Sequence, residues 1–285
     1  LWWRLWNLST PVSTETILAY PAATGFTGPA PRPINGLTRI ATTVTNSRGT
    51  FTVDMLTLDY TATTLRLTTD TGQLNDCTNG CAAFPLATYV SRRSGAAGLH
   101  GTYFCPPDYA SCAGQTNSYF YPVYNTAGRV MVNEDRMKYT SQPIVAFDTA
   151  NRPYYYHSTL RFHSLAEMET QMKIDKTTGS GVLRSAISNG PAMIEAKRNV
   201  LNTSQLDSKQ ATVKSNRGAI GWKGNVIYLI NVRGATVIDS AAVAQSLGLD
   251  YAMNLDGGGS AALYYQGRYY VGPGRNLPNA IVIAP

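Results

Sequence analysis

Alternating hydrophobic and polar positions after residue 38 predict β-strands at the start of the folded part of the chain. Residues 39–44, 50–58 and 64–67 are rich in Thr, Val, Ile and Leu, a pattern typical of half-buried strands. The four residues Asn46–Gly49 between the first two segments suit a hairpin turn. We therefore predict an antiparallel hairpin here.

Short apolar runs predict more strands in the second half of the chain. Turn residues separate several of them, at 151–153, 223–224 and 266–267, which indicates further hairpins. The predicted strands are 144–148, 154–157, 218–222, 225–232, 251–255, 263–265, 268–271 and 279–283.

Two helices are indicated by their capping residues and periodicity. Ser164 followed by Glu167 forms a capping box, and the first helix then has an apolar face made of Leu165, Met168 and Met172. That face predicts core packing rather than ligand binding.

The second helix is expected to begin at Asp239 or Ser240 and to bury Val243 and Leu247, with Gly248 as its C-terminal stop. Strands outnumber helices, so the predicted class is α+β, a strand-rich mixed-sheet domain with two or more helices.

The N-terminal region has a different composition. Residues 1–38 are rich in Pro, Gly, Ala and Thr, which predicts an irregular arm or linker, so residues 39–285 form the main domain. The apolar start, residues 1–6, has two interpretations. It is the tail of a removed export signal or of a membrane anchor upstream of Leu1, or a terminal segment docked on the core.

Composition and charge limit the classes of molecule that we expect the protein to bind. Hydrophobic residues make up 44% of the 285 residues and charged residues 14%, with a net charge of +7. The charge indicates either a basic secreted surface or attraction to an anionic substrate. Since Lys and Arg are scattered rather than clustered, we expect no nucleic-acid partner.

Four cysteines fall in two close pairs, Cys77 with Cys81 and Cys105 with Cys112. Two local disulfides in an oxidising compartment are the favoured interpretation. A zinc site made of four thiolates is the alternative, although neither pair has the usual spacing. Disulfides predict an extracytoplasmic location: secreted, periplasmic or at the cell surface.

The segment Asn254–Ser260 (NLDGGGS) is the sharpest local feature. A short strand delivers Asp256 to its end, and three glycines follow. Glycine runs allow unusual backbone angles and close ligand approach, and their N–H groups can form a nest for an anion. A tight turn capped by the Asp side chain is the alternative.

This segment, extended to Ala252, resembles the signature of the phosphodiester glycosidase family. Four further segments resemble other blocks of that family and occur in the same order. They are residues 98–104 (GLHGTYF), 187–191 (ISNGP), 217–221 (RGAIG) and 275–280 (RNLPNA). The resemblance runs from about residue 39 to 285. It implies an uncovering-enzyme-like catalytic fold and a hydrolase that cleaves sugar-1-phosphodiesters at the glycosidic bond, in glycans or exopolysaccharide.

The resemblance also implies roles for individual residues. Asp256 becomes the candidate catalytic carboxylate, with Glu195 as a weaker second carboxylate or a surface charge. His100 stands where many members carry Asn; it takes part in acid–base catalysis or replaces Asn as a hydrogen-bonding residue. Arg217 and Arg275 suit phosphate, or else form structural ion pairs.

The remaining substrate-binding candidates come from the same blocks. The three Asn are expected to bond sugar hydroxyls or to be structural, Tyr103 to stack on a sugar or in the core, and Ser260 to be a ligand hydroxyl or a cap. They are Asn254, Asn189, Asn279, Tyr103, Ser260 and the nest glycines Gly257, Gly258 and Gly259.

We expect no required cofactor and no catalytic metal. His157 and His163 show no ligand spacing, while a structural calcium held by loop oxygens is compatible with the sequence. The expected partner is a phosphorylated glycan or polysaccharide. A non-catalytic glycan-binding or extracellular assembly protein with the same fold is the alternative function.

Overall fold

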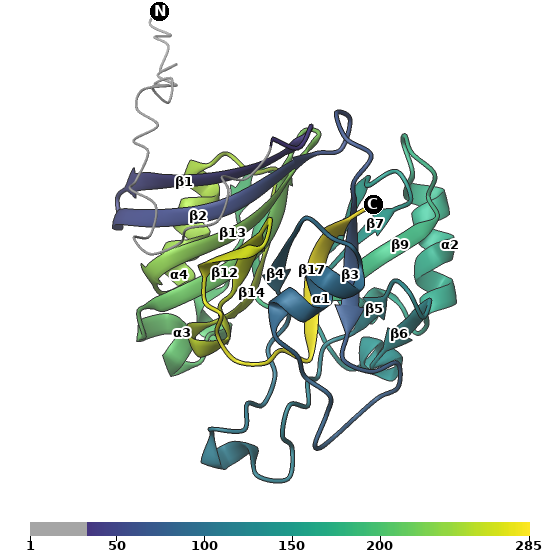
Figure 1. Cartoon of the computed structure of the whole chain (residues 1–285), viewed down its shortest axis with the longest axis horizontal. Coiled ribbons are helices and arrows are strands. Elements are labelled where there is room, and N and C mark those ends of the chain that lie inside the picture. Colours follow the sequence, from purple (N-terminus) through teal and green to yellow (C-terminus); the bar gives the residue numbers. More distant parts are fainter. Residues whose placement is uncertain (1–32) are drawn as a thin grey trace, which may run out of the picture.

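The computed structural model describes residues 33–285, which form three β-sheets with helices on their outer faces (Figure 1). The first sheet has seven strands in the order β1-β2-β13-β12-β14-β10-β11. These are β1 (Leu37–Asn46), β2 (Gly49–Asp59), β13 (Val226–Ala235), β12 (Ser215–Lys223), β14 (Tyr251–Gly257), β10 (Ala192–Glu195) and β11 (Arg198–Asn199).

The other two sheets have five strands each. The second has the order β16 (Arg268–Val271), β15 (Leu263–Tyr265), β4 (Ala97–His100), β17 (Asn279–Ala284) and β3 (Arg66–Thr71). The third has the order β6 (Val130–Val132), β5 (Val123–Asn125), β9 (Leu183–Ser188), β7 (Ile144–Asp148) and β8 (Pro153–Tyr156).

Every predicted hairpin is confirmed. Asn46 pairs with Gly49 between β1 and β2, and β7–β8, β12–β13 and β15–β16 pair in the same way. The α+β class is also confirmed. All strand pairings within residues 33–285 are antiparallel, so the predicted mixed sheet is corrected. In the hairpins, a short connection returns the second strand beside the first, which favours antiparallel pairing.

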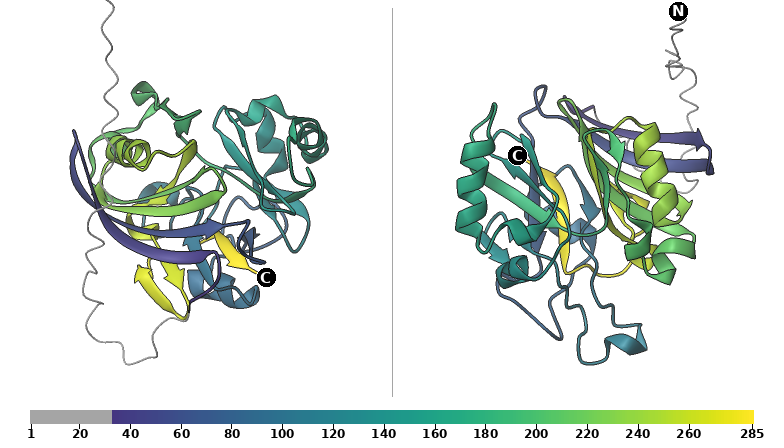
Figure 2. Two further views of the ribbon diagram at one scale, coloured as in Figure 1. Left: turned by 90° about the horizontal axis from the view of Figure 1, so that it is seen from above. Right: turned by 180° about the vertical axis from the view of Figure 1, so that it is seen from behind.

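The inner faces of the three sheets meet in one hydrophobic core. It contains Leu56 and Ile220 from the first sheet, Leu99 from the second, and Val145 and Ile187 from the third. Figure 2 shows the third sheet as a layer beside the other two. Because one core joins all three sheets, the described residues form a single domain.

Each sheet carries a helix on its outer face. Helix α4 (Val237–Ser246) packs on the first sheet, α1 (Leu86–Arg92) on the second and α2 (Leu165–Asp175) on the third. The short α3 (Ser208–Thr212) precedes β12. Single 3₁₀ turns are η1 (Ala110–Cys112), η2 (Glu134–Lys138), η3 (Thr159–Arg161), η4 (Thr203–Gln205) and η5 (Gly258–Ser260).

The predicted start of the first helix is confirmed at Ser164, whose hydroxyl accepts a hydrogen bond from the Glu167 N–H. Met168 and Met172 are fully buried under α2, as predicted. Burial of each such side chain contributes about 1.5–3 kcal/mol, so this packing holds the helix on the third sheet.

The predicted cap of the second helix is wrong by three residues or more. Thr236 caps α4, since its hydroxyl accepts from the Asp239 N–H while the Asp239 carboxylate accepts from the Thr236 N–H. Asp239 is therefore inside the first turn, and this reciprocal pair satisfies two backbone donors at once.

Both predicted disulfides are present, Cys77–Cys81 and Cys105–Cys112, which excludes the four-thiolate zinc alternative. They lie between β3 and β7. That part of the chain also contains α1, β4, β5 and β6, for which the sequence pattern predicted no element.

The predicted domain boundary after residue 38 lies inside the first strand, since β1 begins at Leu37 and Ile34 packs against the core. Residues 1–32, which include the rest of the predicted arm and the region of the proposed anchor, lie outside the described residues. No helix within residues 33–285 has the length and apolar character needed to span a bilayer.

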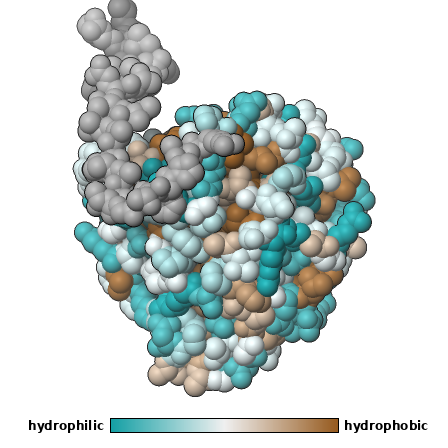
Figure 3. Space-filling view, viewed as in Figure 1, coloured by the Kyte–Doolittle hydropathy of each residue, from teal (hydrophilic) through white to brown (hydrophobic). Residues whose placement is uncertain are grey.

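Exposed large hydrophobic side chains within residues 33–285 come from separate segments, such as Leu74, Tyr139 and Ile174. Figure 3 shows hydrophobic and hydrophilic residues interspersed on one face of the molecule. Recessed parts of the surface are therefore the places where a ligand is best enclosed.

Candidate active site

The strand β14 delivers Asp256 to one end of the first sheet. The side chain is 9% exposed, and its Oδ1 accepts a hydrogen bond from the Gly257 N–H at 2.7 Å. Burial raises the pKa of Asp256 to about 7, against the opposing effects of Gly257, Ser260 and two arginines. A carboxyl group with a pKa near neutrality is suited to acid–base work.

The three glycines after Asp256 serve different needs. A Cβ on Gly257 would lie 2.3 Å from the Asn216 carbonyl oxygen, Gly258 has a positive φ of +59°, and a Cβ on Gly259 would lie 2.7 Å from Nη1 of Arg275. The last contact shows that Gly259 lets a guanidinium approach the backbone closely.

Arg275 is the cation that borders this turn. Its Nη1 lies 3.5 Å from Oγ of Ser260, and its Nε and Nη2 donate to the two carboxylate oxygens of Asp108 at 2.8 and 2.6 Å. The positive charge of Arg275 also lowers the pKa of Asp256. The guanidinium is thus held in a two-pronged geometry of the kind that recognises carboxylate and phosphate.

Asp108 and its neighbour Tyr109 belong to the loop closed by the Cys105–Cys112 disulfide. The Tyr109 ring lies between two cations, with Lys209 Nζ at 4.4 Å and Arg275 Cζ at 5.1 Å from its centroid. The loop therefore docks beside Asp256. Sequence reasoning missed Asp108, Tyr109 and Lys209; the cysteine spacing predicted a pinned loop but not its position.

Arg217 lies on β12 beside the end of β14, where it pairs with Gly257. Its Nε donates to the Ala235 carbonyl at 3.2 Å, and Nη2 donates to the carbonyls of Lys209 and Val213 at 2.8 and 2.7 Å. Arg217 as a whole residue is 6% exposed. Its hydrogen bonds tie α3 to the sheet, and its charge lowers the pKa of Asp256.

Asn254 lies two residues before Asp256 on β14, next to an irregularity in the pairing of β14 with β12. Its Nδ2 donates to Oη of Tyr103 at 2.6 Å, and Gln210 Nε2 donates to the same oxygen at 3.2 Å. Burial, and secondarily the charge of Asp256, raise the pKa of Tyr103. Tyr103 is therefore a neutral wall of the site.

Two further predicted asparagines hold the segment around Tyr103. Asn189 Oδ1 accepts from the Thr102 hydroxyl at 2.6 Å and from the Tyr103 N–H at 3.0 Å, and Asn279 Oδ1 accepts from the Thr102 N–H at 2.9 Å. Asn254 Oδ1 and Asn279 Nδ2 lack a partner within residues 33–285. Those two atoms keep hydrogen-bonding capacity, whereas the contacts of Asn189 are structural.

His100 is fully buried on β4. Its Nδ1 lies 3.1 Å from both the N–H and the carbonyl oxygen of Ala262, and accepts from the N–H in the neutral ring; its Nε2 lies 2.7 Å from the backbone carbonyl of Asp256. These partners fit the neutral tautomer with the proton on Nε2, and burial lowers the pKa of His100. Gly218 leaves the space for the ring, since a Cβ there would lie 2.1 Å from Nε2.

Three residues considered from sequence lie elsewhere. Glu195 pairs with His157 at 2.5 Å, at the other end of β14 from Asp256, since its neighbour Ile194 pairs with Ala252. His163 pairs with Glu167 at the start of α2. Glu195 is therefore rejected as a second carboxylate of this site.

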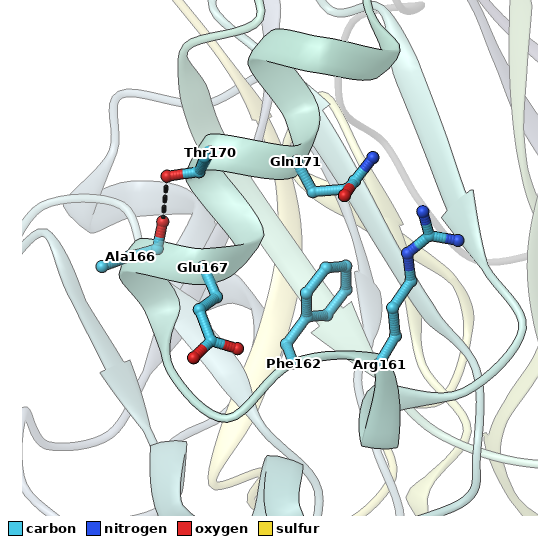
Figure 4. Close-up of a pocket in the computed structure, with 6 residues that line it drawn as sticks. All are labelled: Arg161, Phe162, Ala166, Glu167, Thr170 and Gln171. Atoms are coloured by element: carbon cyan, nitrogen blue, oxygen red, sulfur yellow. Dashed lines mark hydrogen bonds between the residues drawn. The ribbon is translucent and has the colours of Figure 1, made fainter.

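A separate hollow of about 390 Å³ lies on the third sheet, beside α2 (Figure 4). Figure 4 shows Phe162 at its base, with Glu167 and Thr170 from the helix; Thr170 donates to the Ala166 carbonyl. None of the predicted site residues lines this hollow, so we do not connect it with the chemistry at Asp256.

The family model described as phosphodiester glycosidase matches residues 111–284. No curated protein matches the chain. Among solved structures, a hypothetical protein from Synechocystis is similar with a TM-score of 0.63 and 14% identity, over 88% of this chain and 62% of that one. This chain thus spans less than two thirds of that protein.

A second solved structure is the catalytic domain of zebrafish N-acetylglucosamine-1-phosphodiester alpha-N-acetylglucosaminidase, auto-inhibited by its pro-peptide. Its TM-score is 0.61 at 15% identity, over 89% of this chain and 84% of that one. At such identities the two structures establish the fold. The family model covers more than half of the 285 residues, and the chain therefore belongs to the phosphodiester glycosidase family.

Proposed function

We propose that the protein hydrolyses sugar-1-phosphodiesters at the glycosidic bond, with Asp256 as the catalytic carboxylate. The observation that carries this proposal is the position of Asp256: at a glycine-lined strand end, 9% exposed, with a pKa raised to about 7 and two arginines acting on it. Family membership supports the reaction class.

The bond that breaks joins the anomeric carbon to a phosphate oxygen. The phosphate leaves with the bonding electrons, and because it is stable as an anion it needs little help from a general acid. Water supplies the new hydroxyl group. The ionised Asp256 activates this water or attacks the anomeric carbon itself, so turnover requires loss of the Asp256 proton.

Arg275 and Ser260 are the proposed phosphate contacts, since they lie together across the Gly259 turn. A phosphodiester has the charge and oxygen geometry that Asp108 presents to Arg275, so substrate binding displaces Asp108. Arg217 acts through its charge, because three backbone carbonyls already occupy its Nε and Nη2.

The role of His100 follows from its contacts. Its Nε2–H donates to the Asp256 carbonyl and its Nδ1 accepts from Ala262, so a proton shuttle to the substrate has no free ring nitrogen. We therefore assign His100 as a positioning residue for Asp256. Asn254 and Asn279 are buried, and their amides bond Tyr103 and Thr102, so we assign them to hold the wall of the site rather than to contact sugar hydroxyls.

The proposed location is extracytoplasmic and the proposed substrate is a glycan or exopolysaccharide. Two disulfides support an oxidising compartment. The net charge of +7 supports attraction of an anionic polymer.

The test is release of free sugar from a sugar-1-phosphodiester by the full chain and its Asp256→Asn variant. We expect the variant to lose at least a thousandfold in kcat, while the matched control Asp59→Asn, at the end of β2, keeps wild-type turnover. Undiminished turnover by Asp256→Asn would remove Asp256 from the mechanism.

Non-catalytic glycan binding is the second candidate, and one observation favours it: Asp108 fills the two-pronged face of Arg275. If Asp108 cannot be displaced, the phosphate position stays closed. Sugar binding by the wild type without product from any phosphodiester in a substrate panel would select this candidate.

A further inference from the structure

An aromatic cleft of about 630 Å³ adjoins the Asp256 site, lined by Tyr103, Tyr119, Phe120 and Tyr121, with Arg136 among its polar groups. Tyr103 belongs to both regions, because its ring lines the cleft while its hydroxyl contacts Asn254, two residues before Asp256. The cleft and the site therefore share Tyr103 as a common wall. The cleft lies beside the disulfide loops between β3 and β5, which protrude at the bottom of Figure 1.

The rings form a connected series leading away from Asp256. Tyr103 and Tyr121 have centroids 6.5 Å apart, Tyr121 and Phe120 are 6.2 Å apart, and the Arg136 guanidinium lies 4.7 Å from the Phe120 centroid. The first pair is tilted by 50° and the second by 88°. Successive rings thus turn different faces and edges toward a ligand.

Core packing does not account for this series. Phe120, at its outer end, is 43% exposed, which is costly for a large apolar ring unless a ligand covers it. Arg136 forms no ion pair with any residue in 33–285. Its guanidinium is therefore available to oxygens of a ligand that lies along Phe120.

The wall of the cleft is held rigid before any ligand binds. Both disulfide loops contribute to it through Cys77 and Cys105. The first loop is tied to the segment that follows the second, since Cys81 N–H donates to the Thr116 carbonyl at 3.1 Å and Thr116 N–H donates to Asn79 Oδ1 at 2.9 Å. A preformed wall reduces the entropy lost on binding.

We propose that this cleft binds the saccharide chain attached to the scissile linkage, so that the natural substrate is an oligosaccharide or polysaccharide rather than a single sugar phosphodiester. Aromatic faces pack against the C–H faces of sugar rings, while Arg136 offers donors to hydroxyl groups. The volume exceeds what one sugar ring needs. The scissile linkage and its position at Asp256 rest on the proposed function, whereas saccharide binding by the cleft does not.

The test measures binding of the full chain to an array of neutral oligosaccharides and of oligosaccharides that carry a sugar-1-phosphodiester, each series one to six sugars long. Wild-type binding is expected to strengthen with length beyond two sugars in at least one series. Phe120→Ala should weaken binding of the longest members about tenfold and abolish the length dependence. Tyr139→Ala removes a ring that is 69% exposed and outside the cleft, so it should retain wild-type behaviour.

Two results would overturn the inference: no length dependence in any series for the wild type, or an unchanged length dependence in Phe120→Ala. The outcome is separable from the proposed function, because Asp256→Asn can be assayed on the same array. Length-dependent binding without hydrolysis by the wild type would uphold the cleft and reject the reaction. Hydrolysis of a single-sugar phosphodiester, with binding that does not strengthen with chain length, would uphold the reaction and reject the cleft as a saccharide-binding site.

Discussion

Replacing Asp256 by Asn is expected to stabilise the protein at alkaline pH while it abolishes activity. The carboxyl group has an ordinary pKa of 3.8 when unfolded, and burial raises the pKa to about 7 in the fold. Between these values the unfolded state releases the proton and the folded state keeps it, so stability falls as the pH rises from about 4 to about 7. Above pH 7 the folded protein carries the full cost of a buried charge.

The size of this effect follows from the two pKa values. Their difference, at about 1.4 kcal/mol per pKa unit, corresponds to about 4 kcal/mol. Asn keeps an oxygen for the Gly257 N–H, so the loss of hydrogen-bond strength is expected to be about 1 kcal/mol. Asp256→Asn should therefore gain about 2–4 kcal/mol of unfolding free energy at pH 8 and almost none near pH 4.

Urea denaturation at pH 8, 6 and 4.5 measures this directly, since the midpoint and slope give the unfolding free energy. Asp59→Asn is a control of opposite sign. Hydrogen bonds from Thr61 lower the pKa of Asp59, so its replacement should not stabilise the fold at pH 8. A loss of stability in Asp256→Asn at pH 8, or an equal gain at all three pH values, would show that this carboxylate is not desolvated.

Three other outcomes follow from the site. The kcat/KM of the wild type should rise about tenfold per pH unit below pH 7 and level off above it, because the ionised Asp256 is the active form; a profile that falls through pH 7 would contradict this role. Asp108→Asn should lower KM for a phosphodiester about two- to fivefold by freeing Arg275. The control Asp135→Asn, which breaks another exposed ion pair, should leave KM unchanged. An unchanged KM in Asp108→Asn would show that Arg275 does not bind the phosphate. Gly218→Ala should destabilise the protein by about 1–3 kcal/mol and lower kcat, because the added Cβ would lie 2.1 Å from His100 Nε2 and 2.7 Å from the Asp256 carbonyl oxygen. Thermal melting and steady-state rates measure the two effects. Wild-type values for both would argue against His100 as a positioning residue.

Local signals in the sequence were sufficient for the hairpins and for the start of α2. A turn such as Asn46–Gly49 and a cap such as Ser164 act on neighbouring residues, so their effects can be recognised within a short window. The same holds for Cys77–Cys81 and Cys105–Cys112, where close spacing favours local closure. The position of the α4 cap was missed because Thr236 lies among apolar residues that read as strand.

The family blocks located Asp256, Arg217 and Arg275 along the chain, but not what their side chains contact. Arg217 reads as a phosphate ligand by residue type, whereas the fold gives its nitrogens to the carbonyls that end α3. His100 reads as a proton carrier, yet β4 places it between two backbone groups. The partners of His100 are 156 and 162 residues away along the chain, and a local pattern does not reveal them.

The sequence by itself determined the strand-rich class, the disulfide pairs and the carboxylate that ends β14, since each depends on neighbouring residues or on a short motif. Tertiary structure alone decided that a disulfide loop brings Asp108 onto Arg275, that burial raises the pKa of Asp256, and that Tyr103, Tyr121 and Phe120 line one cleft. These properties depend on solvent exclusion and on distances between remote segments, and both arise only when the three sheets pack around one core.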